Sequence, residues 1–184
     1  PRRSVKSLRV TQTAPSLLLL IPAYNEEKRI EPVLRDFATY FRDHYAGRFQ
    51  LVVVLNGCWD NTLGVVQAAE QKYLSISHLE FHGRIGKGGA LIEGLKLAPL
   101  ADLIAYLDAD GATSPSALLE LVQRCQPGET DCVIASRWLP GAAHASSDPK
   151  NAHLILTPPS LCLAARFVGP DPAPFARAHG SEAA

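Results

Sequence analysis

The chain is organised around residues 104–115, which read IAYLDADGATSP. Residues 104–107 form a short apolar run, which is typical of a buried strand, and two carboxylates, Asp108 and Asp110, follow it directly. A glycine, a serine and a proline after the second carboxylate then predict a turn into a new helix. The stretch therefore predicts a buried strand that ends in a pair of acids.

The acid pair has two interpretations. Carboxylates at the carboxyl end of a buried strand lie where open α/β sheets bind their ligands. Asp108 and Asp110 repel each other unless a cation lies between or beside them, and Mg²⁺ commonly binds one or two carboxylates together with substrate phosphates. The pair is thus either a metal–diphosphate site or a solvated polar turn without a ligand, and these residues alone do not decide between the two.

The composition narrows the class of protein. The 184 residues are 47% hydrophobic and 20% charged, which suits a single globular α/β domain with a sizeable core. The formal net charge is zero, so no basic field points to nucleic acid as a partner. No apolar run approaches the roughly 20 residues of a transmembrane helix, and no signal peptide is recognisable. The 4 cysteines lack a Cys-x-x-Cys pair and predict reduced thiols in a cytoplasmic protein.

Strand, loop and helix alternate from residue 17 to about residue 137. The predicted strands are residues 17–21, 50–55, 79–81, 104–107 and 132–135. The predicted helices are residues 30–41 (ended by Gly47), 65–73, 90–97 and 116–124, with a glycine loop at 83–89. This order predicts an α/β fold with a mostly parallel sheet and helices on both faces, so that each polar motif lies along one edge of the sheet.

The chain divides into three parts in this interpretation. Residues 1–15 are polar and basic and are expected to form a flexible N-terminal segment, and residues 16–138 are expected to form the α/β domain. Residues 139–184 are rich in proline and alanine and are expected to be partly irregular or disordered. One mildly amphipathic stretch in this tail, residues 160–168, predicts a helix.

Four motifs together resemble a known family. Residues 21–27 read IPAYNEE, residues 86–90 read GKGGA, residues 108–113 read DADGAT and residues 135–137 read ASR. Their order and spacing resemble family 2 glycosyltransferases of the GT-A fold, which is Rossmann-like. The chain is most similar to the dolichyl- or polyprenyl-phosphate sugar synthases, in particular to the dolichyl-phosphate β-glucosyltransferase branch.

The resemblance implies that residues 16–138 are a nucleotide-sugar-binding domain with a nucleotide pocket after the first two strands. Pro22, Tyr24 and Glu26 would line it, with the ring against a nucleobase and the carboxylate on a ribose hydroxyl. The alternative is an ordinary turn with acids at a helix N-terminus. Asn56 stands where relatives have an acid that bonds the base, and its amide can still donate and accept.

The Asp60 and Thr62 side chains fit the motif that follows Asn56 in the family. They are equally consistent with groups that cap the next helix. The sequence leaves both interpretations open.

The resemblance also implies a diphosphate site. Asp108 and Asp110 would hold Mg²⁺ or Mn²⁺, which offsets charge as the nucleoside diphosphate leaves. Lys87, at a helix N-terminus that favours anions, and Arg137, after the last strand, would contact phosphate oxygens. The alternative is that the lysine and the arginine are solvated surface residues.

The expected activity is inverting transfer of a hexose from a nucleotide diphosphate sugar, of UDP-glucose or GDP-mannose type, to a polyprenyl-phosphate-like acceptor. A phosphate acceptor is already anionic and needs no general base, which fits the few carboxylates after Arg137. They are Asp148, Asp171 and Glu182. A lipid-phosphate partner implies possible peripheral association with the inner face of a membrane.

Two other functions remain open. The first is a nucleotide-sugar-binding domain with little or no transferase activity, because the basic helical acceptor region of the family has no counterpart after Arg137. The second is a sugar nucleotidyltransferase, which is disfavoured because such enzymes usually carry a glycine- and arginine-rich loop after the first strand.

Overall fold

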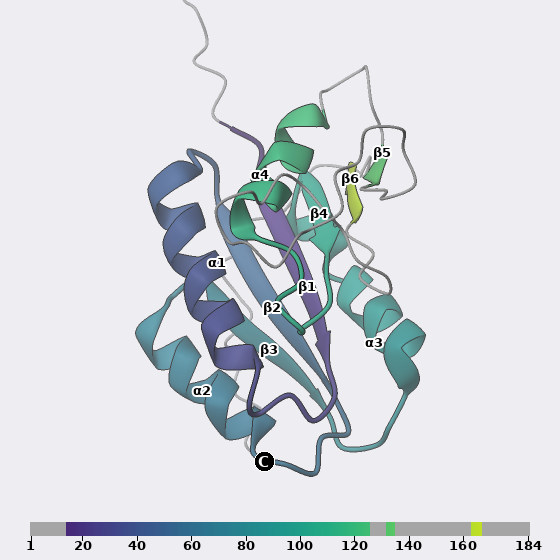
Figure 1. Ribbon diagram of the computed structural model, residues 1–184. Coiled ribbons are helices and arrows are strands. Elements are labelled where there is room, and N and C mark those ends of the chain that lie inside the picture. Colours follow the sequence, from purple (N-terminus) through teal and green to yellow (C-terminus); the bar gives the residue numbers. More distant parts are fainter. Residues whose placement is uncertain (1–13, 126–131, 135–162, 167–184) are drawn as a thin grey trace, which may run out of the picture.

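The computed structural model describes residues 14–125, 132–134 and 163–166. It contains a six-stranded sheet with the strand order β3-β2-β1-β4-β6-β5 (Figure 1). The strands are β1 (Leu17–Ala23), β2 (Phe49–Asn56), β3 (Ile76–Phe81), β4 (Leu103–Tyr106), β5 (Cys132–Ile134) and β6 (Leu163–Arg166). The helices are α1 (Ile30–His44), α2 (Thr62–Lys72), α3 (Gly86–Leu95), α4 (Pro115–Arg124) and the short 3-10 helix η1 (Ala98–Leu100).

The sheet is parallel in its main part, as the alternation of strands and helices predicts. β1 pairs in parallel with β2 and with β4, and β2 pairs in parallel with β3. In this register Leu19 lies opposite both Leu51 and Ala105. Only the β4–β6 and β5–β6 pairs among the described strands are antiparallel. The predicted fold class is therefore confirmed.

Helices cover both faces of the sheet. Successive β1 side chains point to opposite faces, so Leu19 and Ile21 pack in a core with α1, α2 and α4, whereas Leu18 and Leu20 pack in a second core with α3. Figure 1 shows α1 and α2 on one side of the sheet and α3 on the other. No helix of the described residues combines the length and the apolar character that crossing a bilayer requires.

The strand order reverses beside β1. The chain runs outward from β1 through β2 to β3, and α3 then carries it back across the sheet to β4, on the other side of β1. Ligands of open α/β sheets bind outside the carboxyl ends of the strands at such a reversal. The fold thus marks the loops after β1 and β4 as the place to look for a site.

Two predicted boundaries differ from the structure. α3 begins at Gly86, within the predicted glycine loop, instead of at Ala90. Glycine has a low helix propensity, but Gly89 packs under the Ile85 side chain and Ala90 is fully buried, so tertiary packing outweighs the local preference. β3 begins at Ile76, before the weak apolar pattern at 79–81, because it pairs along β2.

The predicted helix at 160–168 is wrong where the structure describes it. Residues 163–166 form strand β6, which pairs antiparallel with β4 and β5. A short apolar run does not distinguish a helix from a strand by its pattern alone, and pairing with distant strands decides the outcome. The proposed boundary between residues 138 and 139 stays a prediction.

Gly47 does not end the first helix directly. α1 ends at His44, and the backbone N–H of Tyr45 caps it by donating to the Phe41 carbonyl. A Cβ at Gly47 would overlap the Pro15 carbonyl oxygen, to which the Tyr45 hydroxyl donates a hydrogen bond of 2.5 Å. The glycine therefore allows the chain before β1 to pass close to the turn after α1.

The Tyr45 hydroxyl makes the free energy of unfolding depend on pH in the alkaline range. Burial, with a smaller contribution from the Asp102 carboxylate, raises the pKa of Tyr45 to about 12. Because this folded-state pKa lies above the ordinary value near 10, the stability from the neutral hydroxyl is complete below about pH 10 and is lost as the pH rises through the folded pKa.

We expect Tyr45→Phe to lower the free energy of unfolding by about 1 kcal/mol near neutral pH. The difference from wild type shrinks as the pH rises above about 10, because ionisation removes the same hydrogen bond from the wild type. Urea denaturation across this range measures it, with Tyr40→Phe on the same helix as the control. A difference that does not change with pH would contradict this explanation.

Candidate functional site

A pocket of about 320 Å³ lies at the carboxyl ends of β1, β2 and β4. Every predicted site residue except Arg137 lines it, and Arg137 lies outside the described residues. The lining residues are Pro22, Ala23, Tyr24, Glu26, Arg29, Asn56, Lys87, Asp108, Ala109 and Asp110. Segments that are distant in sequence thus meet at the reversal of strand order.

A larger hollow of about 510 Å³ lies at the opposite end of the strands, where β1, β2 and β3 begin at Leu17, Phe49 and Ile76. Its lining is mixed apolar and polar and includes a hydrogen bond of 2.6 Å between His78 Nδ1 and Glu70 Oε1. We take the smaller pocket as the candidate site, because parallel sheets bind ligands at the carboxyl ends of their strands.

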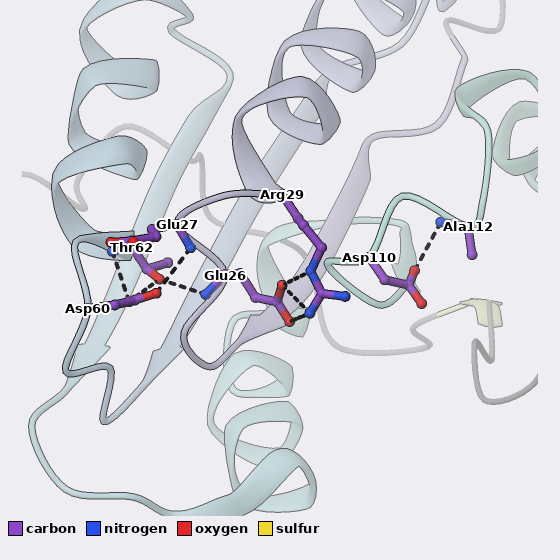
Figure 2. A network of polar contacts seen from close by, with 7 residues as sticks. All are labelled: Glu26, Glu27, Arg29, Asp60, Thr62, Asp110 and Ala112. Atoms are coloured by element: carbon purple, nitrogen blue, oxygen red, sulfur yellow. Dashed lines mark hydrogen bonds and ion pairs between the residues drawn. The ribbon is translucent and has the colours of Figure 1, made fainter.

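The two carboxylates are held by the turn after β4. Gly111 adopts a φ of 75°, a left-handed conformation that glycine accepts readily, and turns the chain toward α4. The Ala112 N–H donates to Asp110 Oδ1 at 2.9 Å (Figure 2). Ala109, between the acids, is buried, so the backbone of the pair is anchored. Both acids line the same pocket.

Lys87 already neutralises one of the acids. Its Nζ lies 2.5 Å from Asp108 Oδ1. The lysine side chain is 50% exposed whereas the Asp108 side chain is 13% exposed, so the lysine is the partner that can swing away. The lysine ammonium group is therefore a positive charge of the protein itself beside the two neighbouring carboxylates.

The loop after β1 places an aromatic ring and an acid in the pocket. The Arg84 guanidinium lies 4.4 Å from the centroid of the Tyr24 ring, so one face of the ring carries a cation–π contact. Glu26 accepts two hydrogen bonds from Arg29, of 2.8 and 3.0 Å (Figure 2). Arg29 also lines the pocket and is not among the predicted site residues, although an acid and a base three residues apart at a helix start are a recognisable pair.

Asn56 lines the pocket and also makes a hydrogen bond to the backbone. It is 5% exposed, and its Oδ1 accepts a hydrogen bond of 2.7 Å from the Ile85 N–H just before α3. The Asn56 oxygen therefore holds the chain at the start of α3, in addition to the place of Asn56 in the pocket lining. The predicted contact of Asn56 with a nucleobase stays a prediction.

Asp60 and Thr62 lie at the start of α2, outside the pocket lining. Asp60 Oδ1 accepts hydrogen bonds from the Thr62 N–H at 3.1 Å and from the Thr62 hydroxyl at 2.5 Å. Burial raises the pKa of Asp60, but the hydrogen bonds from Thr62 and from the Glu27 N–H outweigh it and hold the pKa below its ordinary value. The helix-start interpretation of these two residues is thus supported.

The sequence profile described as "Glycosyl transferase family 2" matches residues 19–159, which is most of the chain. The chain belongs to this family. The match includes every residue that lines the candidate pocket, so the pocket lies within the family 2 region of the chain.

Named relatives agree with this assignment. The chain is 34% identical over 123 residues to Glycosyltransferase AglD of Haloferax volcanii, covering 66% of this chain and 20% of the relative. It is 37% identical over 128 residues to Dolichyl-phosphate beta-glucosyltransferase ALG5D of Trichomonas vaginalis, covering 65% of this chain and 39% of the relative. The chain spans between 20% and 52% of the length of the curated relatives it matches.

A solved structure supports the same fold. Glucosyl-3-phosphoglycerate synthase from Mycobacterium tuberculosis, in complex with Mn²⁺, uridine diphosphate and glucosyl-3-phosphoglycerate, superposes with a TM-score of 0.52 at 25% sequence identity. The superposition covers 64% of this chain and 42% of that chain. The family 2 domain therefore has the GT-A-like architecture that the motifs predicted.

The Asn56 bond gives a testable prediction. Asn56→Ala leaves the Ile85 N–H without its acceptor, and we expect the free energy of unfolding to fall by about 1–3 kcal/mol. Asn56→Asp keeps an acceptor oxygen at this position and should lose less. Urea denaturation of both variants measures the difference, and equal stability of Asn56→Ala and wild type would show that the bond contributes nothing.

Proposed function

We propose that the protein is an inverting, metal-dependent hexosyltransferase that uses a nucleotide diphosphate sugar and a polyprenyl-phosphate-like acceptor. The observation that carries the proposal is the pocket at the carboxyl ends of β1, β2 and β4. It gathers two acids, a lysine and a tyrosine from separate segments of a family 2 domain.

The nucleotide half of the donor would lie against the loop after β1. Pro22 and the Tyr24 ring would pack on the base, and the Asn56 amide nitrogen would donate to it. Glu26 would accept from a ribose hydroxyl while it remains bonded to Arg29, because each oxygen of a carboxylate can accept more than one hydrogen bond. A base of the uracil or guanine type fits this proposal, which leaves UDP-glucose and GDP-mannose as the two donors to test.

The acid pair fits a Mg²⁺ or Mn²⁺ ion. Asp108 and Asp110 supply two carboxylates, and the described residues gather no group of three or more acid, histidine or cysteine ligands. A site of this kind suits a hard divalent ion whose remaining ligands come from substrate phosphates. When bound, the metal offsets charge on the leaving diphosphate. Lys87 and Arg137 would contact phosphate oxygens beside it.

The acceptor proposal rests on the named relatives, several of which are dolichyl-phosphate glucosyltransferases. A lipid phosphate is anionic near neutral pH, so it can attack the anomeric carbon without a protein base. Displacement from the side opposite the diphosphate inverts the configuration at that carbon. We further propose a cytoplasmic protein that associates peripherally with a membrane to reach such an acceptor.

A second candidate is a domain that binds nucleotide sugar with little or no transferase activity. It requires the same donor pocket, with its acid pair and lysine, but no acceptor site. Turnover separates the two candidates, since both require metal-dependent binding of the donor but only the first yields a glycosylated lipid phosphate.

The central test is turnover of UDP-glucose and GDP-mannose with Mg²⁺ or Mn²⁺ and a short polyprenyl phosphate. We expect one donor to be consumed and Asp110→Ala to reduce both turnover and metal-dependent nucleotide affinity by at least about tenfold, since a metal ligand is lost. Asp36→Ala, an exposed acid on α1 that pairs with Arg35, is the matched control.

The outcomes of this test differ in meaning. Metal-dependent binding of UDP or GDP without product supports the second candidate. Unchanged metal-dependent binding by Asp110→Ala contradicts the metal assignment. If wild type binds neither nucleotide in the presence of the metal, both candidates fail.

Lys87 gives a separate prediction. The ion pair with Asp108 competes with a divalent ion for the same carboxylate. We expect Lys87→Met to strengthen Mn²⁺ binding in the absence of nucleotide and to weaken UDP or GDP binding in the presence of Mn²⁺. Titration followed by electron paramagnetic resonance of free Mn²⁺ measures the first effect, and calorimetry measures the second. Lys96→Met, near the end of the same helix, is the control. Weaker Mn²⁺ binding by Lys87→Met without nucleotide would argue against competition.

A further inference from the structure

Two loops at the pocket edge are joined by hydrogen bonds from side chain to backbone. We name residues 24–29, between β1 and α1, the first loop, and residues 57–61, between β2 and α2, the second loop. The Glu26 N–H donates to Thr62 Oγ1 at 2.8 Å, and the Glu27 N–H donates to Asp60 Oδ2 at 3.2 Å (Figure 2). In the other direction the Asn61 N–H donates to Glu27 Oε2 at 2.8 Å.

Thr62 is the centre of this network. It is fully buried, and its hydroxyl accepts from the Glu26 N–H while it donates to Asp60 Oδ1. Because an ionised carboxylate only accepts, the direction of every bond in the chain Glu26–Thr62–Asp60 is fixed. A side chain at position 62 must both accept and donate, which serine can do and valine, of nearly the same shape, cannot.

The first loop contains a left-handed turn that a side chain ties to the second loop. Asn25 has a φ of 56°, in the left-handed region that asparagine adopts more readily than most residues with a Cβ. Its Oδ1 accepts from the Trp59 N–H at 3.0 Å, which joins this turn to the second loop. Tyr24 and Glu26 flank Asn25 and both line the pocket, so the turn and its bonds lie directly beside two pocket residues.

We propose that Thr62 and Asp60 are positioning residues that fix the first loop, and with it Tyr24 and Glu26, in the geometry that binds the nucleotide. Neither residue lines the pocket, so they act through the Glu26 and Glu27 amides and not by contact with the ligand. The inference rests on the proposed function, because fixing the first loop affects nucleotide binding only if the pocket binds a nucleotide.

The test compares Thr62→Val with Thr62→Ser. Calorimetric titration with UDP and with GDP, each with Mn²⁺, measures affinity, and amide hydrogen exchange at Glu26 and Glu27 reports the loop without any ligand. We expect Thr62→Val to expose the Glu26 amide and to weaken nucleotide binding by about tenfold or more, since a buried amide loses its partner. Thr62→Ser should restore both to within about threefold of wild type.

Thr39→Val is the matched control. Thr39 lies on the exposed face of α1 and its hydroxyl donates to the Arg35 carbonyl at 2.8 Å, so the same chemical change occurs far from the network. If Thr62→Val does not fold, Asp60→Asn takes its place: an amide has one accepting oxygen instead of two, so at least one of the bonds to Thr62 and Glu27 is lost and affinity falls.

The outcomes separate this inference from the proposed function. If wild type binds neither nucleotide, the proposed function fails whatever the loop does. If wild type binds, and a folded Thr62→Val exposes the Glu26 amide yet binds as tightly as wild type, the positioning role is overturned. Equal loss of affinity in Thr62→Ser and Thr62→Val would also overturn it, because the hydroxyl would then not be the cause.

Discussion

The site depends on the parallel pairing of β1 with both of its neighbours. Ala23 lies opposite Leu55 of β2, and Leu20 lies opposite Tyr106 of β4, so three carboxyl ends meet at one edge. Each strand continues into a polar segment within a residue or two of this edge. A shift of one residue in the β4 register would turn its side chains to the other face and move the acid pair with them. The apolar cores that fix the register therefore also fix the site.

The charged and aromatic groups in the pocket have partners in the protein itself. Lys87 pairs with Asp108, Arg29 pairs with Glu26 and Arg84 lies against the Tyr24 ring. Binding a metal, a diphosphate or a nucleobase would thus exchange one set of contacts for another. The net free energy of binding is the difference between the two sets, which is smaller than the sum of the new contacts. The Lys87 ammonium group also reduces the repulsion between Asp108 and Asp110.

The sequence predicts the central sheet well because its signals are local. The apolar run before Asp108 and the continuous apolar run at 51–55 are buried strands in the structure, and both continue into the pocket. The bond from Ile85 to Asn56 and the contact of Arg84 with Tyr24 could not be predicted, because each joins segments whose separation in space depends on the finished fold. The antiparallel strand at 163–166 escaped prediction for the same reason, since strands far away in sequence define it.

Asp60 shows why two interpretations of one motif need not exclude each other. A residue that caps a helix and a residue that shapes a binding site seem to be alternatives when only the sequence is considered. A carboxylate has two oxygens, however, and here Oδ1 accepts from Thr62 at the start of α2 while Oδ2 accepts from Glu27 in the loop beside the pocket. The bonds that begin the helix therefore also hold the neighbouring loop. Because the loops that follow β1 and β2 emerge at the same end of the sheet, a side chain that organises one of them is close enough to organise the other.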